Sequence, residues 1–343
     1  MRKLKHNIKR NVSLKEYTTF KIGGVASFFV EVDDLQRLSG VLNWANTHQQ
    51  KIFILGGGSN LLLTDKKFDG LIIKIINKDF RVVVDGERVV VNCGAGVRLG
   101  KVVSEVVKLN ASGLEWAVGI PGTVGGAVRG NAGAFGGEMK DVVKKVAAVN
   151  IRKKELPDNC YSFPIIFPNE LPEEISQNCE EVIQVFGNKD CEFGYRDSIF
   201  KEILSLLIWE VEFELRITGQ DVKKNVEEIL KRRKSKQSKT IKYPSAGSVF
   251  KNPLVSERIQ EMFKEDTGVV ARNGRVPAGW LVEKVGLKGK RIGGAMVSEY
   301  HSNFIVNLGD ATFDDVLILI GLIKTAVRNE FGVKLEEEIT IIY

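Results

Sequence analysis

Residues 119–138, GIPGTVGGAVRGNAGAFGGE, are the part of this chain best suited to hold a ligand with its backbone. Glycine recurs with valine and alanine between, and the only charged side chains are Arg129 and Glu138. Because glycine tolerates positive φ and lets a backbone approach a ligand closely, such a run is typical of amides wrapped around something flat or anionic. Tight turns are the alternative, but a turn needs only one or two glycines. The run therefore predicts a cofactor cradle.

Two shorter glycine motifs precede this run. Residues 56–60, GGGSN, follow a predicted buried strand at residues 51–55. A strand that ends this way has free amides at its tip, which is the geometry for holding a pyrophosphate, although an ordinary β-turn fits equally well. Residues 93–100, CGAGVRLG, have G-x-G-x-x-x-G spacing instead of G-x-G-x-x-G, so they indicate a Rossmann dinucleotide site only weakly.

Metal and disulfide chemistry have little support in the sequence. The four cysteines contain no CxxC pair, and the three histidines contain no HExxH. We therefore expect no metal site and no disulfide framework. The basic N-terminus lacks the apolar run of a signal peptide, and no stretch is apolar for the roughly 20 residues that span a bilayer. These patterns predict a cytoplasmic protein in a reducing compartment, without a membrane partner.

The chain is long enough for two or three lobes and carries a mild basic excess, with 343 residues, 43% hydrophobic residues and a net charge of +7. Basic residues gather at 1–11 and 223–242, and acidic residues at 155–192. Residues 231–242 have no aromatic side chain among them, so a solvated helix end or a contact with a small anionic substrate is favoured over nucleic acid. A nucleic-acid-binding module remains the alternative, and its binding would weaken steeply with salt.

The elements expected before residue 218 form a mostly antiparallel or mixed sheet structure. Hydrophobic patterning predicts a helix from Asp33 or Asp34 to Gln49 and another over 97–109. Strands are expected at 28–32, 51–55, 71–76, 142–151 and 208–217, with a hairpin over 82–91 that turns at Asp85-Gly86. Residues 153–190 resemble an inserted excursion that is partly ordered at best.

Gly219 marks the expected start of an α+β lobe. Asp221 can cap a basic helix that runs to about Lys236, and residues 243–253 suggest a turn followed by a strand. Further helices are expected at 256–266, 278–285 and 312–330, and strands at 303–307 and 334–343.

Eight motifs in order give the chain a resemblance to the UDP-N-acetylenolpyruvoylglucosamine reductase family: YTTFKIGG, LGGGSNLL, GIPGTVGGAVRGNAGAFGGE, FGYRDSIFK, PSAGSVFKNP, AGWLVEKVGLKG, HSNFIVN and LEEEI. The resemblance implies an α+β fold with an FAD-binding lobe of the vanillyl-alcohol-oxidase-like (PCMH) type at residues 1–218. That lobe would have subdomains at about 1–77 and 78–218, with the excursion 153–190, followed by a substrate lobe at 219–343. The chain looks like the shorter branch, which lacks a tyrosine-bearing insertion.

The resemblance also implies the reaction and its participants. Non-covalent FAD would be reduced by NADPH and would then reduce UDP-N-acetylglucosamine enolpyruvate to UDP-N-acetylmuramate for peptidoglycan. No nucleic acid, membrane or metal takes part, and a monomer is expected. Two alternatives stay open: an oxygen-dependent flavin oxidase of the same fold, and an inactive flavin-binding relative.

Three catalytic residues follow from the same resemblance. Arg196 would bind the carboxylate on which charge develops, Ser248 would donate a proton to C2, and Glu338 would be the catalytic glutamate. Without the resemblance, Arg196 beside Asp197 is a surface ion pair and Ser248 a turn serine. On a strand, Glu336 and Glu338 share one face, so alternation alone does not separate them; the register set by Leu335 selects Glu338.

The resemblance assigns the remaining site residues by motif. The residues implied in FAD binding are Gly56, Gly57, Gly58, Ser59, Asn60, Pro121, Gly122, Thr123, Val124, Gly125, Gly126, Asn131, Ala132 and Gly133. Those implied in substrate binding are Asn252, Lys236 and Tyr195; a turn cap is the alternative role for Asn252. A family arginine is replaced by Thr340, for which Lys236, Lys251 or Lys242 would compensate.

Overall fold

The computed structural model describes residues 7–152, 182–237 and 243–343. These residues form two compact units that share the chain. The first contains Met1–Val12, Ala26–Gly57 and Asp69–Lys231, and the second Ser13–Val25, Gly58–Phe68 and Arg232–Tyr343. The two units are defined by which residues pack together, and this packing does not identify the ligand of either unit. The functional division at 218/219 therefore stays a prediction.

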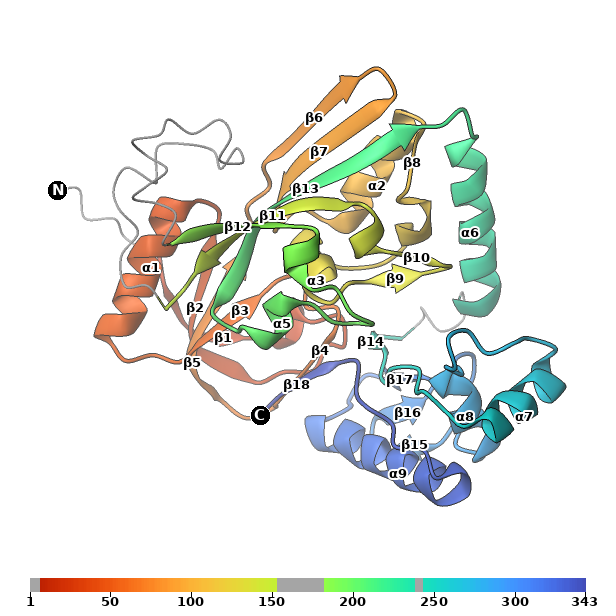
Figure 1. Ribbon diagram of the computed structural model, residues 1–343. Helices are drawn as coiled ribbons and strands as arrows, with labels where there is room; N and C mark the ends of the chain where they lie inside the picture. Colours follow the sequence, from red (N-terminus) through yellow and green to blue (C-terminus); the bar gives the residue numbers. More distant parts are fainter. Residues whose placement is uncertain (1–6, 153–181, 238–242) are drawn as a thin grey trace. The chain divides into compact units, whose positions relative to one another are not determined.

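One sheet of the first unit has the strand order β1-β2-β5-β3 (Figure 1). Its strands are β1 (Lys9–Ser13), β2 (Val25–Val32), β5 (Phe68–Ile75) and β3 (Ile52–Leu55), and β3 pairs with β5 in parallel. Helix α1 (Leu35–Thr47) begins at Asp34, whose side chain accepts a hydrogen bond from Arg37 N at 2.7 Å. Its buried positions recur at helical spacing as predicted: Leu35, Leu38, Val41, Leu42 and Ala45.

The second sheet of this unit is antiparallel throughout, with the order β12-β11-β13-β7-β6 and β8 beside β13. Its strands are β6 (Phe80–Asp85), β7 (Arg88–Gly94), β8 (Ala111–Ser112), β11 (Val143–Asn150), β12 (Ile183–Gly187) and β13 (Leu206–Ile217). The hairpin predicted at Asp85-Gly86 is confirmed by the pairing of Asp85 with Arg88. Helix α2 (Leu99–Lys108) packs against β8. Helix α3 (Val124–Arg129) packs against β7 and β13.

Residues 153–181 of the predicted excursion 153–190 lie outside the described residues. Its described end is regular: β12 pairs with β11, and a short 3-10 helix (Lys189–Cys191) follows. Other short elements of the unit complete the path: η2 (Glu115–Ala117), β9 (Gly133–Ala134), β10 (Gly137–Glu138), η3 (Met139–Asp141) and α5 (Ile199–Glu202). Helix α6 (Val222–Gln237) starts where predicted, because Asp221 accepts a hydrogen bond from Lys224 N.

The second unit contains an antiparallel sheet with the order β14-β17-β16-β15 and its own hydrophobic core. The strands are β14 (Ser245–Ser248), β15 (Arg291–Ile292), β16 (Ala295–Val297) and β17 (Phe304–Asn307). Its helices are η1 (Lys15–Tyr17), α7 (Glu257–Thr267), α8 (Ala278–Lys284) and α9 (Phe313–Phe331). Helix α9 packs against β15 and β16, and a Thr312–Asp315 capping box starts it.

The last strand is shorter than predicted. Only β18 (Thr340–Ile342) is a strand, paired in parallel with β4 (Leu61–Leu63), so the prediction of a strand over 334–343 was wrong for 334–339. Burial nevertheless alternates through much of this segment, because Val333, Leu335 and Ile339 are buried whereas Lys334 and Glu336 are exposed. Glu336 is exposed and Glu338 is half-buried, so the two glutamates that alternation places on one face differ in exposure.

Candidate active site

The tip of β3 and the glycine run touch backbone to backbone in the first unit. A Cβ atom on Gly57 would lie 2.7 Å from the Cα of Gly122, and one on Gly56 would lie 2.9 Å from Thr123 Oγ1. Any larger residue at Gly57 would collide with the neighbouring backbone. Glycine is thus required here for the two loops to meet, before any ligand is considered.

The amides at this contact fall into two groups. Val124 N donates to Val97 O at 2.8 Å and Gly125 N to Ala95 O at 3.0 Å, which ties the start of α3 to the loop after β7. The second group consists of amides that donate to no acceptor in the described parts of the chain: Gly56, Gly57, Gly122, Thr123 and Gly126. Backbone donors gathered in this way are suited to an anion.

Arg196 is held against the far end of the glycine run. Its backbone is left-handed, with φ +57°, and its Nη2 donates to Gly133 O at 2.8 Å. Its guanidinium carbon lies 5.4 Å from the ring centre of Tyr195. The Lys201 ammonium donates to Arg196 O at 2.8 Å.

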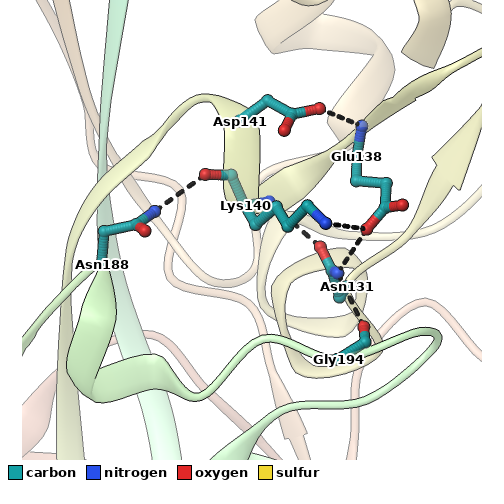
Figure 2. A network of polar contacts seen from close by, with 6 residues as sticks. All are labelled: Asn131, Glu138, Lys140, Asp141, Asn188 and Gly194. Atoms are coloured by element: carbon teal, nitrogen blue, oxygen red, sulfur yellow. Dashed lines mark hydrogen bonds and ion pairs between the residues drawn. The ribbon is translucent and has the colours of Figure 1, made fainter.

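Asn131, within the glycine run, bonds the arginine segment at Gly194 (Figure 2). The side chain is fully buried, and its Nδ2 donates to Glu138 Oε2 and to Gly194 O, each at 2.8 Å. Its Oδ1 accepts a hydrogen bond from Lys140 N at 3.0 Å. The polar atoms of Asn131 are therefore used inside the protein.

Ser248 and Glu338 lie on neighbouring segments of the second unit. Ser248 ends β14, where it pairs with Phe304. Glu338 N donates to Val249 O at 2.7 Å, and Phe250 forms an isolated antiparallel bridge with Glu337. The structure thus brings together two residues that are 90 positions apart in the sequence.

The other two glutamates of this motif are in ion pairs. Glu337 Oε1 accepts a hydrogen bond from Lys324 Nζ at 2.8 Å, and Glu336 lies 3.4 Å from Lys251 Nζ. Lys251, one of the lysines expected to replace the family arginine, is therefore engaged with Glu336. Lys236 lies in α6 and its side chain is not described, while Lys242 falls outside the described residues.

Asn60 bonds the glutamate motif within the second unit. Its Nδ2 donates to Glu338 O at 2.9 Å, and its own carbonyl accepts from Thr340 N at 2.9 Å. The two bonds extend the parallel β4–β18 pairing by one step, so Asn60 fixes the backbone on both sides of Ile339. The sequence interpretation assigned Asn60 to FAD alone.

Comparisons with known proteins cover nearly the whole chain. A family model described as "UDP-N-acetylenolpyruvoylglucosamine reductase, C-terminal domain" matches residues 239–342, and one described as "FAD binding domain" matches residues 26–153. The UDP-N-acetylenolpyruvoylglucosamine reductase of Alkaliphilus oremlandii is 37% identical over 96% of this chain and 91% of its own length. The chain belongs to the UDP-N-acetylenolpyruvoylglucosamine reductase family. The reductase of Caldicellulosiruptor bescii is 39% identical over 96% of this chain and 88% of its own length.

A solved structure of a family member has the same fold. The crystal structure of UDP-N-acetylenolpyruvylglucosamine reductase from Thermus caldophilus is 29% identical and covers 98% of this chain and 99% of its own, with a TM-score of 0.69. As a member of this reductase family, the chain is an FAD-dependent oxidoreductase with an α+β fold, an FAD-binding domain and the reductase C-terminal domain. The predicted family and fold class are thereby confirmed.

The described residues fit FAD at the contact between the β3 tip and the glycine run. The amides of Gly56, Gly57, Gly122, Thr123 and Gly126 are donors without an acceptor in the described chain, which suits the negative pyrophosphate. A Cβ atom on Gly126 would meet only Thr123 Oγ1, at 3.6 Å, so the space beside this amide is open. Val124 and Gly125, by contrast, use their amides inside the reductase.

Asn252 has a role that is visible within the second unit. Its Oδ1 accepts a hydrogen bond from Ala278 N at 3.0 Å, the first residue of α8, and its carbonyl accepts from Arg275 Nη1 at 2.8 Å. The Asn252 side chain thus bonds the start of α8, a contact different from the turn cap that the sequence offered, and a substrate contact stays a prediction. Arg196 and Tyr195 belong to the first unit, Ser248, Glu338 and Asn252 to the second.

The described parts of this reductase contain no candidate metal site and no exposed cysteine. No group of three or more His, Cys, Asp or Glu side chains there can hold a metal ion. Cys93 and Cys191 are free and buried, and burial raises the pKa of both thiols, that of Cys191 to about 12. None of the described helices has the length and apolar character of a membrane span.

Proposed function

We propose that this chain reduces UDP-N-acetylglucosamine enolpyruvate to UDP-N-acetylmuramate, with NADPH as the hydride donor to FAD. The reaction supplies a peptidoglycan precursor in the cytoplasm, and the enzyme acts as a monomer. The observation that supports this proposal is the likeness to named reductases over 96% of the chain. The substrate lobe at 219–343 and the FAD lobe at 1–218 are part of the same proposal.

When bound, FAD would supply hydride chemistry between NADPH and C3 of the enolpyruvyl double bond. Arg196 holds the substrate carboxylate, where negative charge develops as the double bond accepts the hydride. Its guanidinium is a permanent cation with a planar pair of donors. The Ser248 hydroxyl delivers a proton to C2, so hydride and proton together complete one reduced carbon–carbon bond. Glu338 acts beside Ser248 as the catalytic glutamate.

The bond from Glu338 N to Val249 O supports this pairing of roles, because it keeps the two segments in register. Preorganised groups of this kind need no rearrangement when charge develops. Tyr195, Lys236 and Asn252 contribute to substrate binding in this proposal, and Ala132 and Gly133 line the FAD side.

Anaerobic half-reactions test the proposal. The purified yellow protein should be bleached by NADPH and recover its flavin absorbance when UDP-N-acetylglucosamine enolpyruvate is added. NADPH oxidation that ignores this substrate would count against the proposal. Turnover with oxygen and a small alcohol would favour the flavin oxidase, and a protein that binds FAD without either reaction would be the inactive relative.

Ser248→Ala separates the two half-reactions. The substitution removes the proposed proton donor, so flavin reduction by NADPH should stay near the wild-type rate. Recovery of absorbance with the enolpyruvyl substrate should fall by about 10²-fold or more. Stopped-flow absorbance measures both rates, with Ser256→Ala, before α7, as a matched serine control. Loss of both half-reactions would mean that Ser248 has another role.

A further inference from the structure

Asn131 connects three segments of the first unit through one buried side chain (Figure 2). Both Nδ2 protons are used, toward Glu138 Oε2 and Gly194 O, and Oδ1 accepts from the backbone of Lys140. An asparagine amide has two donors and two acceptor sites, and three of the four are occupied here. The side chain is 0% exposed, so it is not available to a ligand. Its role is therefore to hold protein segments together.

One of the held segments carries Arg196. Gly194 and Asp197 exchange two backbone hydrogen bonds, which close a tight turn over Tyr195 and Arg196. Arg196 is left-handed at φ +57°, a conformation that costs free energy for any residue other than glycine. Such a conformation persists only when surrounding contacts determine it.

Those contacts come from the glycine run at three points. Asn131 Nδ2 binds Gly194 O at the start of the turn, and Ser198 Oγ donates to Arg129 O at 2.7 Å after it. Between them, Arg196 Nη2 donates to Gly133 O. The run thus holds the turn at both ends and holds the guanidinium as well.

Glu138 completes the arrangement from the other side. It accepts from Asn131, lies 3.3 Å from the Lys140 ammonium, and its backbone N–H donates to Asp141 Oδ2. These bonds fix the Glu138 carboxylate, which in turn fixes the orientation of the Asn131 amide. A buried donor whose acceptor is lost costs more than the bond itself contributed.

We propose that Asn131, oriented by Glu138, is a positioning residue that sets the turn of Arg196 for the substrate carboxylate, and is not an FAD contact. The inference rests on the proposed function for the part that concerns the substrate. Its structural part, that Asn131 holds residues 194–198, does not depend on the reaction. The two parts are therefore tested separately.

Amide hydrogen exchange of the FAD-free protein tests the structural part. In Asn131→Ala, exchange at residues 194–198 should accelerate by about tenfold or more, because the bond to Gly194 O is lost. Asn188→Ala is the matched control: its Nδ2 donates to Lys140 O and Val143 O in the same network, but no bond reaches 194–198 (Figure 2). Equal exchange in Asn131→Ala and the wild type would overturn the proposal. If Asn131→Ala does not fold, Asn131→Asp, which keeps the size but lacks the donors, is measured in the same way.

Half-reaction kinetics test the functional part. Asn131→Ala should keep FAD and its reduction by NADPH, and slow flavin reoxidation by the enolpyruvyl substrate by about tenfold or more. Because the effect passes through Arg196, adding Asn131→Ala to Arg196→Lys should slow reoxidation no further. Additive losses, or loss of FAD from Asn131→Ala alone, would overturn the positioning role. A wild-type protein that the substrate does not reoxidise would instead overturn the proposed function, and the exchange result would still decide what Asn131 holds.

Discussion

Glu210 is a carboxyl group enclosed in the middle of the six-stranded sheet. It lies on β13, paired with Gly94 of β7 and Ala147 of β11, and is 8% exposed. Burial raises its pKa to about 8, and the charges of Asp79 and Glu212 act in the same direction. At neutral pH the group is therefore mostly protonated in the folded chain.

Glu210 should make the folded state less stable as the pH rises. The ordinary pKa is 4.5, so between 4.5 and about 8 the folded chain keeps a proton that the unfolded chain has released. The contribution of this group to the free energy of unfolding then falls by up to about 1.4 kcal/mol per pH unit, and levels off above the folded pKa. Urea denaturation across this window measures the slope. Glu210→Gln should flatten it, and parallel profiles of variant and wild type would contradict the prediction.

At the scale of elements, the glycines of the cofactor loops serve two different purposes. Gly57 and Gly137 are required by the protein itself, since a Cβ atom would lie 2.7 Å from Gly122 Cα and 2.1 Å from the Trp116 ring. Gly126 has no such neighbour, because Thr123 Oγ1 at 3.6 Å is an ordinary contact. Its side of α3 is open beside an amide without an acceptor in the described chain.

Gly126→Ala should lower FAD affinity without lowering the stability of the folded protein. Alanine is favoured over glycine in a helix by about 1 kcal/mol, so the FAD-free variant should unfold at the same temperature as the wild type or higher. FAD affinity should nevertheless fall, because a methyl group stands where the ligand approaches. Thermal unfolding and flavin fluorescence titration measure the two effects. Gly57→Ala is the contrast and should lose stability and FAD together; unchanged FAD affinity in Gly126→Ala would remove Gly126 from the site.

At the scale of the molecule, each compact unit has its own hydrophobic core. Val30, Leu38 and Phe213 belong to the first core, and Phe20, Phe250 and Leu281 to the second. The chain passes between the units several times before it ends in the second. Short segments such as β4 therefore belong to a unit whose main part comes more than 150 residues later in the chain.

FAD should stabilise the whole protein through its diphosphate. A ligand at about 100 times its Kd raises the free energy of unfolding by about 2.7 kcal/mol when it binds only the folded state. Thermal unfolding with increasing FAD measures this shift. Riboflavin, which has the ring but no phosphate, is the control and should stabilise much less if the free amides hold the pyrophosphate. Equal stabilisation by both compounds would contradict an anion cradle.

Much of the site is local and could be predicted from the sequence. Several features depend only on residues a few positions apart: the two glycine motifs, the helix starts at Asp34 and Asp221, and the hairpin at Asp85-Gly86. Backbone conformation and capping are decided over such short distances, so residue type and spacing predict them. The eight motifs also predicted the reductase family, because they occur together and in the same order as in that family.

The sequence by itself determined where backbone amides can face a ligand and which family the chain belongs to; tertiary structure alone decided which of these groups are already used. Asn60 and Asn131 were both assigned to FAD from their motifs, yet one bonds Glu338 O and the other Gly194 O. Residues 336–338 likewise pair with residues 249–251, through Lys251 N to Glu336 O and Glu338 N to Val249 O, a partner that the predicted strand over 334–343 did not indicate. The physical reason is that hydrogen bonds of buried polar groups are satisfied by partners brought near by folding, and no spacing within a motif encodes those partners.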